Sequence, residues 1–334
     1  MSQHSSELHK IVDRFKDKRV VVFGDLVADV FVYGEISRIS REAPVLILSH
    51  RESQLVPGGG ANAVHNLWAL GAKPLPVGLV GDDKEGQQLL DYFSNLSIDT
   101  SGVTVAKSYR TPTKMRILAG AVHSQRQQIV RLDSGAPLED DKLRSAVQRE
   151  LQSALKNADA LIVSDYGFGL ATPQVISKAR RDSLPTTVDS RFSMMEFSQL
   201  TAATPNEPEV EAALGITIGN DAQKLERAGR TLLRKLGHVA ILITRGKEGM
   251  ALFERGKKTT HIPIHGSDEV ADVTGAGDTV IATFTLALAA GAGYHDAARL
   301  ANYAGGIVVM KYGTRPVMRQ ELIEALDSED GEVQ

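Results

Sequence analysis

Short, nearly uninterrupted runs of apolar residues recur along the chain, and each is followed by a segment with helical spacing. Strands of a parallel sheet that is covered on both faces have this composition. The runs lie at residues 19–23, 75–80, 160–163, 186–188 and 239–244. The clearest helix is predicted over residues 221–236, where four leucines form one stripe before Gly237. Alternating strands and helices predict a layered α/β fold.

Two segments break this alternation, because each looks like a pair of strands joined by a turn with no helix between them. They cover about residues 30–50 and 112–133. Together they would form a small β-sheet that projects as a lid, or they would extend the main sheet at one edge, and the pattern leaves both arrangements open. We predict one domain over residues 10–326 that carries the lid segments, with flexible tails at residues 1–9 and 327–334.

Composition narrows the class of function. The chain has 334 residues, 42% of them hydrophobic, which suffices for one large domain. A net charge of −3 leaves no basic excess to neutralise a nucleic acid or an anionic membrane. The absence of cysteine excludes disulfides and thiolate nucleophiles. The start of the chain is polar, and the longest apolar stretch, residues 280–292, is too short to span a bilayer, so we expect a cytoplasmic protein.

The most informative stretch is residues 272–279, DVTGAGDT, which directly precedes an apolar helix. Gly275, Ala276 and Gly277 leave the backbone uncrowded at a helix N-terminus, where unpaired N–H groups and the helix dipole attract anions. Asp278 then falls in the first helical turn. Its carboxylate would either stabilise the helix or deprotonate the hydroxyl of a phosphoryl acceptor. Such a turn can supply both the charge neutralisation and the base of a phosphoryl transfer.

Other patterns near strand ends are weaker. Asp25 and Asp29 follow the first strand, at the rim where open α/β sheets bind ligands, and would either bind sugar hydroxyls or only cap turns. No G-x-x-x-x-G-K-[ST] motif occurs, so a Walker-type enzyme is excluded. His261 and His265 have the spacing of a zinc motif, but in a strand they would lie about 13 Å apart, too far to share a metal.

The stretch DVTGAGDT resembles the C-terminal signature of the PfkB/ribokinase-type carbohydrate kinases, and residues 57–62, PGGGAN, resemble their N-terminal signature. The resemblance extends from residue 20 to about residue 326. It implies a ribokinase-like three-layer α/β fold with a mostly parallel central sheet and a small β-sheet lid. It also implies ATP and Mg²⁺ as cofactors, Asp278 as the catalytic base, and the amides of residues 275–277 as an anion hole.

The resemblance implies an acceptor site and a nucleotide site. The expected acceptor-site residues are Asp25, Asp29, Gly58, Gly59 and Asn62. The expected nucleotide-site residues are Thr244, Arg245 and Gly246 near the ATP phosphates, and Asn302 in the adenine pocket. Asn206 and Glu209 form an N-x-x-E motif that would organise magnesium, with Glu209 as the metal-associated carboxylate. Many relatives also have a loop for a monovalent cation such as K⁺, which would involve Asp272 and Thr274 here.

Within this family, residues 34–45 (GEISRISREAPV) and 112–116 (PTKMR) resemble the D-glycero-D-manno-heptose 7-phosphate kinases. The expected reaction is therefore the conversion of heptose 7-phosphate to heptose 1,7-bisphosphate. A sugar that already carries a phosphate needs cationic partners. The candidates are Arg38, Lys114, Arg116 and Arg131.

Two positions depart from the family pattern. Phe168 stands where a lysine is expected, and Ser190-Arg191 replaces Pro-Lys. Two alternatives therefore stay open: a PfkB kinase for a hexose, pentose or nucleoside, and a sugar- or nucleotide-binding regulator with little turnover. No cytidylyltransferase-like second half is apparent, so we expect a kinase only. The apolar face of the lid predicts a homodimer; its residues are Phe31, Tyr33, Val45 and Ile47.

Overall fold

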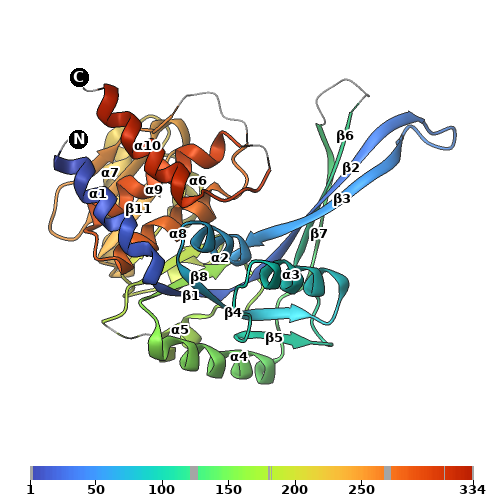
Figure 1. The fold of residues 1–334 in the computed structure, drawn as a ribbon, viewed down its shortest axis with the longest axis horizontal. Helices are drawn as coiled ribbons and strands as arrows, with labels where there is room; N and C mark the ends of the chain where they lie inside the picture. The colour runs from blue at the N-terminus through green and yellow to red at the C-terminus, as the bar shows by residue number, and fades with distance from the viewer. Residues whose placement is uncertain are drawn as a thin grey trace.

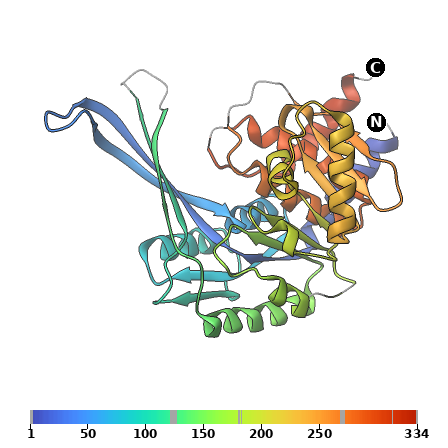
Figure 2. The same cartoon turned by 180° about the vertical axis from the view of Figure 1, so that it is seen from behind.

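The computed structural model describes residues 3–120, 127–179, 181, 183–266, 272–311 and 313–332. They form a three-layer body and a separate sheet that projects from it (Figures 1 and 2). In the described residues the middle layer is a nine-stranded sheet with the order β13-β12-β11-β10-β9-β8-β1-β4-β5. Its strands are β1 (Arg19–Gly24), β4 (Lys73–Gly81), β5 (Val103–Ala106), β8 (Ala160–Asp165), β9 (Thr186–Ser190), β10 (Ala202–Ala203), β11 (Ala240–Thr244), β12 (Met250–Glu254) and β13 (Thr260–Ile262). All neighbours are parallel except at β11–β12 and β12–β13.

The five apolar runs of the sequence correspond to β1, β4, β8, β9 and β11, which confirms the predicted strands. In β1, Val20 and Val22 pack into the core on one face of the sheet. Val21 and Phe23 alternate with them and pack into the core on the other face. Because both faces are covered, both sets of side chains in these strands are apolar.

Helices cover both faces of the sheet. One core includes side chains from α1 (Gln3–Asp13), α2 (Gly60–Ala69), α3 (Lys84–Asn95), α8 (Ala276–Ala289), α9 (Tyr294–Val309) and α10 (Arg319–Glu332). The opposite core includes side chains from α4 (Asp141–Ala154), α5 (Pro173–Ala179), α6 (Glu207–Leu214) and α7 (Ala222–Leu236). The helix predicted at residues 221–236 is α7, which Asp221 caps and Gly237 ends in a left-handed conformation. None of the described helices is long and apolar enough to cross a membrane.

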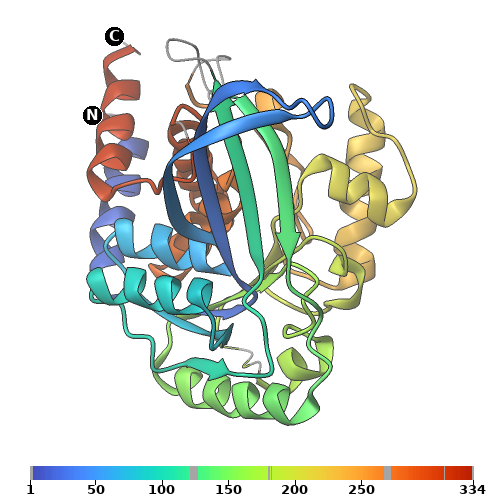
Figure 3. The ribbon, with the colours of Figure 1, turned by 90° about the vertical axis from the view of Figure 1, so that its right-hand side faces the viewer.

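The two strand-rich segments form a four-stranded sheet of their own, with the order β3-β2-β6-β7. Its strands are β2 (Leu26–Ile39), β3 (Leu46–Gly59), β6 (Thr113–Gly120) and β7 (Gln127–Ser134). Figure 3 shows this sheet, called the lid from here on, in front of the body. The arrangement confirms a projecting lid and rules out an extension of the main sheet. Residues 121–126 of the predicted lid segment lie outside the described residues.

The ends of the chain differ from the flexible tails predicted at residues 1–9 and 327–334. Residues 3–9 belong to α1 and residues 327–332 to α10, while residues 1, 2, 333 and 334 lie outside the described part. Leu8 is buried in the core, and the ring of His9 hydrogen-bonds Asp327 at 3.0 Å. The two helices lie side by side because the apolar side of α1 packs near α10 (Figure 1).

Candidate active site

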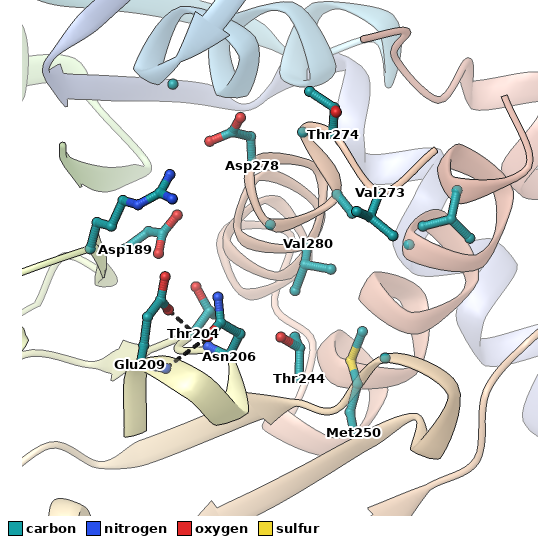
Figure 4. Close-up of a pocket in the computed structure, with 18 of the residues that line it drawn as sticks. Asp189, Thr204, Asn206, Glu209, Thr244, Met250, Val273, Thr274, Asp278 and Val280 are labelled. Atoms are coloured by element: carbon teal, nitrogen blue, oxygen red, sulfur yellow. Dashed lines mark hydrogen bonds between the residues drawn. The ribbon is translucent and has the colours of Figure 1, made fainter. Parts of the chain in front are cut away.

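A cavity of about 600 Å³ lies between the lid and the carboxyl ends of the sheet strands. The lid contributes Asp29, Lys114, Arg116 and Arg131 to its lining. The body contributes residues after β8, β9 and β11, together with residues 273–278 at the start of α8. Several of the lining side chains from the body are shown in Figure 4. The placement follows the general rule that open α/β sheets bind ligands at their carboxyl edge.

Residues 275–277 lie at the cavity wall, where the sequence predicts an anion site. Gly275 is the residue that precedes α8, with φ of 81°, and an added Cβ would lie 2.5 Å from Nδ2 of Asn62. Beside Gly277 there is open space, because a Cβ there would meet only the carboxylate of Asp189, at 4.0 Å. The amide of Ala276 is already engaged, since it donates to the carbonyl of Val273 at 3.2 Å.

Asp278 lies in the first turn of α8, as predicted, and lines the cavity although its side chain is almost fully buried. Asn62 Nδ2 donates to one carboxylate oxygen at 2.9 Å, and the Tyr166 hydroxyl donates to the other at 2.7 Å. Burial raises the pKa of Asp278 to about 6, the charge of Asp29 adds to the rise, and the two hydrogen bonds oppose it. A carboxylate with this pKa can serve as a base near neutral pH.

On the acceptor side, Asp29 lines the cavity and forms an ion pair with Arg116, whose Nη1 lies 2.8 Å from the Asp29 carboxylate. A Cβ at Gly58 would lie 2.7 Å from that carboxylate, so a side chain at this position would displace Asp29. Gly59 also lines the cavity. Asn62 is buried behind the wall and reaches the site through its bond to Asp278.

Asp25, which the resemblance predicts as a sugar-binding residue, does not reach the cavity. It is buried and does not line the cavity, and its Oδ2 accepts hydrogen bonds from the amides of Tyr166 and Phe168. Its Oδ1 has no hydrogen-bond partner among the described residues. Burial raises the pKa of Asp25 to about 7, and hydrogen bonds from backbone amides oppose this rise. In this structure Asp25 holds the loop after β8.

The four predicted lid cations separate into two groups. Lys114, Arg116 and Arg131 line the cavity. Arg38 lies in the exposed outer part of β2 and does not line it, so the structure does not bring this residue to the site. Lys114 Nζ lies 4.5 Å from the centre of the Tyr166 ring, and burial lowers its pKa. Arg131 pairs with the neighbouring Asp133 at 2.9 Å.

On the nucleotide side, Asn206 and Glu209 form a reciprocal capping box at the start of α6. Asn206 Oδ1 accepts from the Glu209 amide, and Glu209 Oε2 accepts from the Asn206 amide, each at 2.9 Å (Figure 4). Both residues line the cavity, as Thr244 and Gly246 do. The N-x-x-E motif therefore caps a helix and also faces the candidate site.

Of the other residues predicted on the nucleotide side, Asn302 lines the cavity and Arg245 does not. Asn302 lines the cavity, and its Nδ2 donates to the carbonyl of Pro263 at 2.8 Å. Arg245 is turned away, because it forms an ion pair with Glu207 at 2.7 Å and does not line the cavity. Asp272 accepts hydrogen bonds from the amides of Thr274 and Gly313, at 2.8 and 3.2 Å, which ties together the segments before α8 and after α9.

The cavity also contains side chains to which the sequence assigned no role. They are Asp165, Tyr166, Asp189, Arg191 and Lys247. Among them, only Arg191 belongs to a position that departs from the family pattern. Burial raises the pKa of Asp189 well above its usual range, and the charges of Glu209 and Asp278 add to this rise. Asp165 and Asp189 lie at the carboxyl ends of β8 and β9, and Tyr166 and Arg191 follow these strands. The signal in the sequence is therefore their position at the binding edge of the sheet.

Comparisons with known proteins agree with this architecture. The bifunctional protein HldE of Geobacter sulfurreducens is 41% identical over 319 residues, which cover 93% of this chain and 64% of that protein. The bifunctional protein HldE of Coxiella burnetii (strain Dugway 5J108-111) is 38% identical over 318 residues, with 94% and 65% covered. The chain thus spans slightly less than two thirds of the length of these relatives.

Two solved structures share the fold at low sequence identity. Arabidopsis thaliana ribokinase complexed with ribose and ATP has a TM-score of 0.73 at 22% identity, covering 93% of this chain and 99% of that one. Phosphofructokinase-2 from Escherichia coli in complex with potassium has a TM-score of 0.78 at 15% identity, covering 94% and 99%. The ribokinase-like fold is therefore confirmed. A model of the pfkB family carbohydrate kinases matches residues 17–321, and with that match the chain belongs to the pfkB family of carbohydrate kinases.

Proposed function

We propose that this carbohydrate kinase transfers the γ-phosphoryl group of ATP to D-glycero-D-manno-heptose 7-phosphate and forms the 1,7-bisphosphate. The observation that carries the proposal is the buried Asp278 at the start of α8, which faces a cavity with lid cations on one side and the capped Glu209 on the other. The choice of acceptor is supported by residues 34–45 and 112–116, which resemble heptose 7-phosphate kinases.

The start of α8 provides the environment for the transferred group. The first amides of a helix have no partners within it, and the helix dipole favours negative charge at this end. The open space beside Gly277 lets a phosphoryl group approach this backbone. These groups would stabilise the negative charge that builds on the equatorial oxygens during transfer.

Asp278 would act as the general base. As the acceptor oxygen attacks the γ-phosphorus and ADP leaves, the hydroxyl proton moves to the Asp278 carboxylate. The raised pKa makes this carboxylate more basic than an exposed aspartate, while it remains ionised at neutral pH. The ion pair of Asp29 with Arg116 places a second, charge-compensated carboxylate on the acceptor side, where it can accept hydrogen bonds from sugar hydroxyls.

The residues on the nucleotide side fit a magnesium ion bound mainly through water and phosphates. Mg²⁺ typically uses one or two carboxylates and keeps several waters. Asp189 and Glu209 lie on the same wall of the cavity, and the charge of Glu209 contributes to the raised pKa of Asp189, a repulsion that a cation would relieve (Figure 4). No cluster of three acidic or histidine ligands occurs in the described residues. Glu209, oriented by Asn206, would therefore hold the ion indirectly, and the ion would neutralise phosphate charge.

Arg191 would supply further positive charge to the phosphates. It lines the cavity, and its guanidinium makes no hydrogen bond or ion pair with any described residue. Its Cζ lies 5.9 Å from the centre of the Phe192 ring. Arg191 also opposes the rise in the pKa of Asp189 and Glu209, so its charge reaches both carboxylates. Replacing Arg191 with methionine should lower kcat by roughly tenfold or more, the cost of a lost bond to a charged group, and an unchanged kcat would contradict the role.

We also propose that the loop held by Asp272 binds a monovalent cation such as K⁺. The loop directly precedes the anion site, so an ion there would fix the start of α8. Turnover measured in potassium chloride and in tetramethylammonium chloride at equal ionic strength tests this. Equal rates in the two salts would contradict a functional role for a monovalent cation.

The reaction is tested by measuring ADP release with a panel of acceptors: heptose 7-phosphate, fructose 6-phosphate, ribose, fructose and adenosine. We expect the highest kcat/KM with heptose 7-phosphate. A higher kcat/KM with another acceptor would agree with kinase activity but would contradict heptose 7-phosphate as the substrate. Binding of both ATP and heptose 7-phosphate without phosphorylation of any acceptor would instead indicate a regulator.

We further propose a cytoplasmic homodimer that pairs through the lid. The lid exposes large apolar side chains, which a monomer would leave in water. They include Ile36, Ile39, Val45, Leu46, Ile129, Val130 and Leu132. Of the residues predicted for this face, Phe31 is buried within the chain, whereas Val45 is 55% exposed. Light scattering should give twice the mass of the 36.0 kDa chain, and a monomer at micromolar concentration would contradict the pairing.

A further inference from the structure

We propose that Tyr166 is a positioning residue, which fixes the orientation of the Asp278 carboxylate through its hydroxyl group. This inference rests on the proposed role of Asp278 as the base. Tyr166 lies immediately after β8, and its side chain is directed to the start of α8, 112 residues further along the chain. Nothing in the phosphate-binding motif itself requires this residue.

The two oxygens of Asp278 are held by donors from different elements. Tyr166 donates its hydroxyl proton to Oδ1 at 2.7 Å, and Asn62, from α2, donates an amide proton to Oδ2 at 2.9 Å. Two fixed donors define the plane of a carboxylate, which is otherwise free to rotate about its last torsion. Each oxygen keeps a second lone pair, so the carboxylate can still receive the proton of an acceptor hydroxyl.

Tyr166 is itself held in place from several sides. Its backbone amide donates to the buried carboxylate of Asp25 at 2.8 Å. The ring lies against Gly59, where an added Cβ would come within 3.1 Å of the ring carbon Cε2. The ammonium group of Lys114, from the lid, lies 4.5 Å from the ring centre, within the range of a cation–π contact. The hydroxyl therefore has little freedom to leave Asp278.

Several neighbouring groups shift the pKa of Asp278. The hydroxyl of Tyr166 is one of those that favour the ionised form. Asp29 on β2 and Asp189 on β9 repel the carboxylate, while Lys114 on β6 attracts it. The hydrogen bonds from Asn62 and Tyr166 lower the pKa of Asp278 against the effect of burial. During transfer Tyr166 keeps its own proton, since burial and the charge of Asp278 raise its pKa well above the usual range.

The test is the variant Tyr166→Phe, which keeps the ring and its contacts with Gly59 and Lys114 but removes the hydroxyl. We expect kcat to fall roughly tenfold or more, in line with the loss of a hydrogen bond to a charged group, while the affinity for ATP stays unchanged. The acid limb of the kcat–pH profile should move to higher pH, because a bond that lowers the pKa of Asp278 is lost. A fall in kcat without that shift would reduce Tyr166 to a structural residue and overturn the proposal.

Tyr92→Phe is the matched control, because it removes a tyrosine hydroxyl that pairs with His65 at 3.3 Å outside the cavity. It should leave the pH profile unchanged. The double variant Tyr166→Phe/Asp278→Asn gives a second measurement: if Tyr166 acts only through Asp278, it should turn over no more slowly than Asp278→Asn alone. Fully additive losses would contradict the inference. Normal turnover by Asp278→Asn would instead overturn the proposed base, so the two failures are distinguishable.

Discussion

Two residues, Asn62 and Tyr166, favour the ionised form of the buried Asp278 carboxylate. Burial raises the pKa of Asp278, and two hydrogen bonds restrain the rise so that the value stays at about 6. A lower pKa would make the carboxylate a weaker base, and a much higher one would leave it protonated at neutral pH. Asn62 and Tyr166 therefore hold the carboxylate in place and lower its pKa against the effect of burial.

The pH dependence of turnover follows from this pKa. The base must be ionised, so kcat/KM should fall as pH is lowered through about 6, where Asp278 takes up a proton. An ordinary aspartate, with a pKa of about 3.9, would retain activity to pH 5 and below. ATP affinity measured over the same range serves as the control. A flat kcat/KM between pH 7 and pH 5 would contradict the assignment.

The sequence predicts the position of a candidate site residue well where a local motif determines it. Asp278 and Gly275 lie as the motif indicates, because a helix start is determined by residues that are adjacent in the chain. Arg38 and Arg245 are different, since a charge pattern does not tell which way a long side chain points: Arg38 is exposed, and Arg245 pairs with Glu207. Tyr166 could not be assigned because its partner lies far along the chain.

At the scale of elements, the start of α8 is the central part of the proposed site. Asp278 and the two glycines, Gly275 and Gly277, come from one continuous stretch of sequence. The adjoining loop is tied to the segment after α9 through Asp272 and Gly313. The proposed anion site would therefore be formed by the backbone, and it should depend on side-chain volume at Gly277 more than on any one charge.

We therefore predict that Gly277→Ala folds normally but loses turnover. A Cβ at this position meets only Asp189, at 4.0 Å, so the protein itself tolerates the methyl group. The methyl group would occupy the space through which the phosphoryl group approaches. We therefore expect kcat/KM for ATP to fall by about 10²-fold, the scale for a lost transition-state contact. Gly293→Ala, at the start of α9 with no atom near its added Cβ, is the control. Equal activity of both variants would contradict a backbone anion site.

The sequence predicts helices and strands where an apolar run or an apolar helical stripe is clear. The five strands and α7 appear within a few residues of their expected bounds. The terminal helices α1 and α10 were not predicted, because their stability comes from packing on each other and on the body, through residues such as Leu8 and Leu326. The pattern also could not decide between a lid and a sheet extension, since strand pairing at long range is not encoded in local alternation.

At the scale of the whole molecule, the cavity lies where the lid meets the carboxyl edge of the main sheet. The lid supplies cations, and the body supplies the helix start and the carboxylates. Neither the volume nor the choice of lining cations can be obtained from sequence patterns alone, because both depend on how the two sheets are oriented. Among the four predicted lid cations, the structure favours Lys114, Arg116 and Arg131 over Arg38.

This distinction gives a matched pair of variants. Arg131→Gln should raise the KM for heptose 7-phosphate by roughly tenfold or more, because a charged bond to the substrate phosphate would be lost, and should leave the affinity for ATP unchanged. Arg38→Gln removes a lid charge outside the cavity and should change neither value. An effect of Arg38→Gln equal to that of Arg131→Gln would show that the lid charges act only at long range.

The central claim is that Asp278 removes the proton of the acceptor hydroxyl beside the start of α8. The most direct measurement is the rate of phosphoryl transfer by Asp278→Asn, with ATP binding measured on the same sample. We predict nearly normal ATP affinity and a rate at least about 10²-fold lower, the low end for a lost general base. A rate close to that of the unmodified protein would contradict the account.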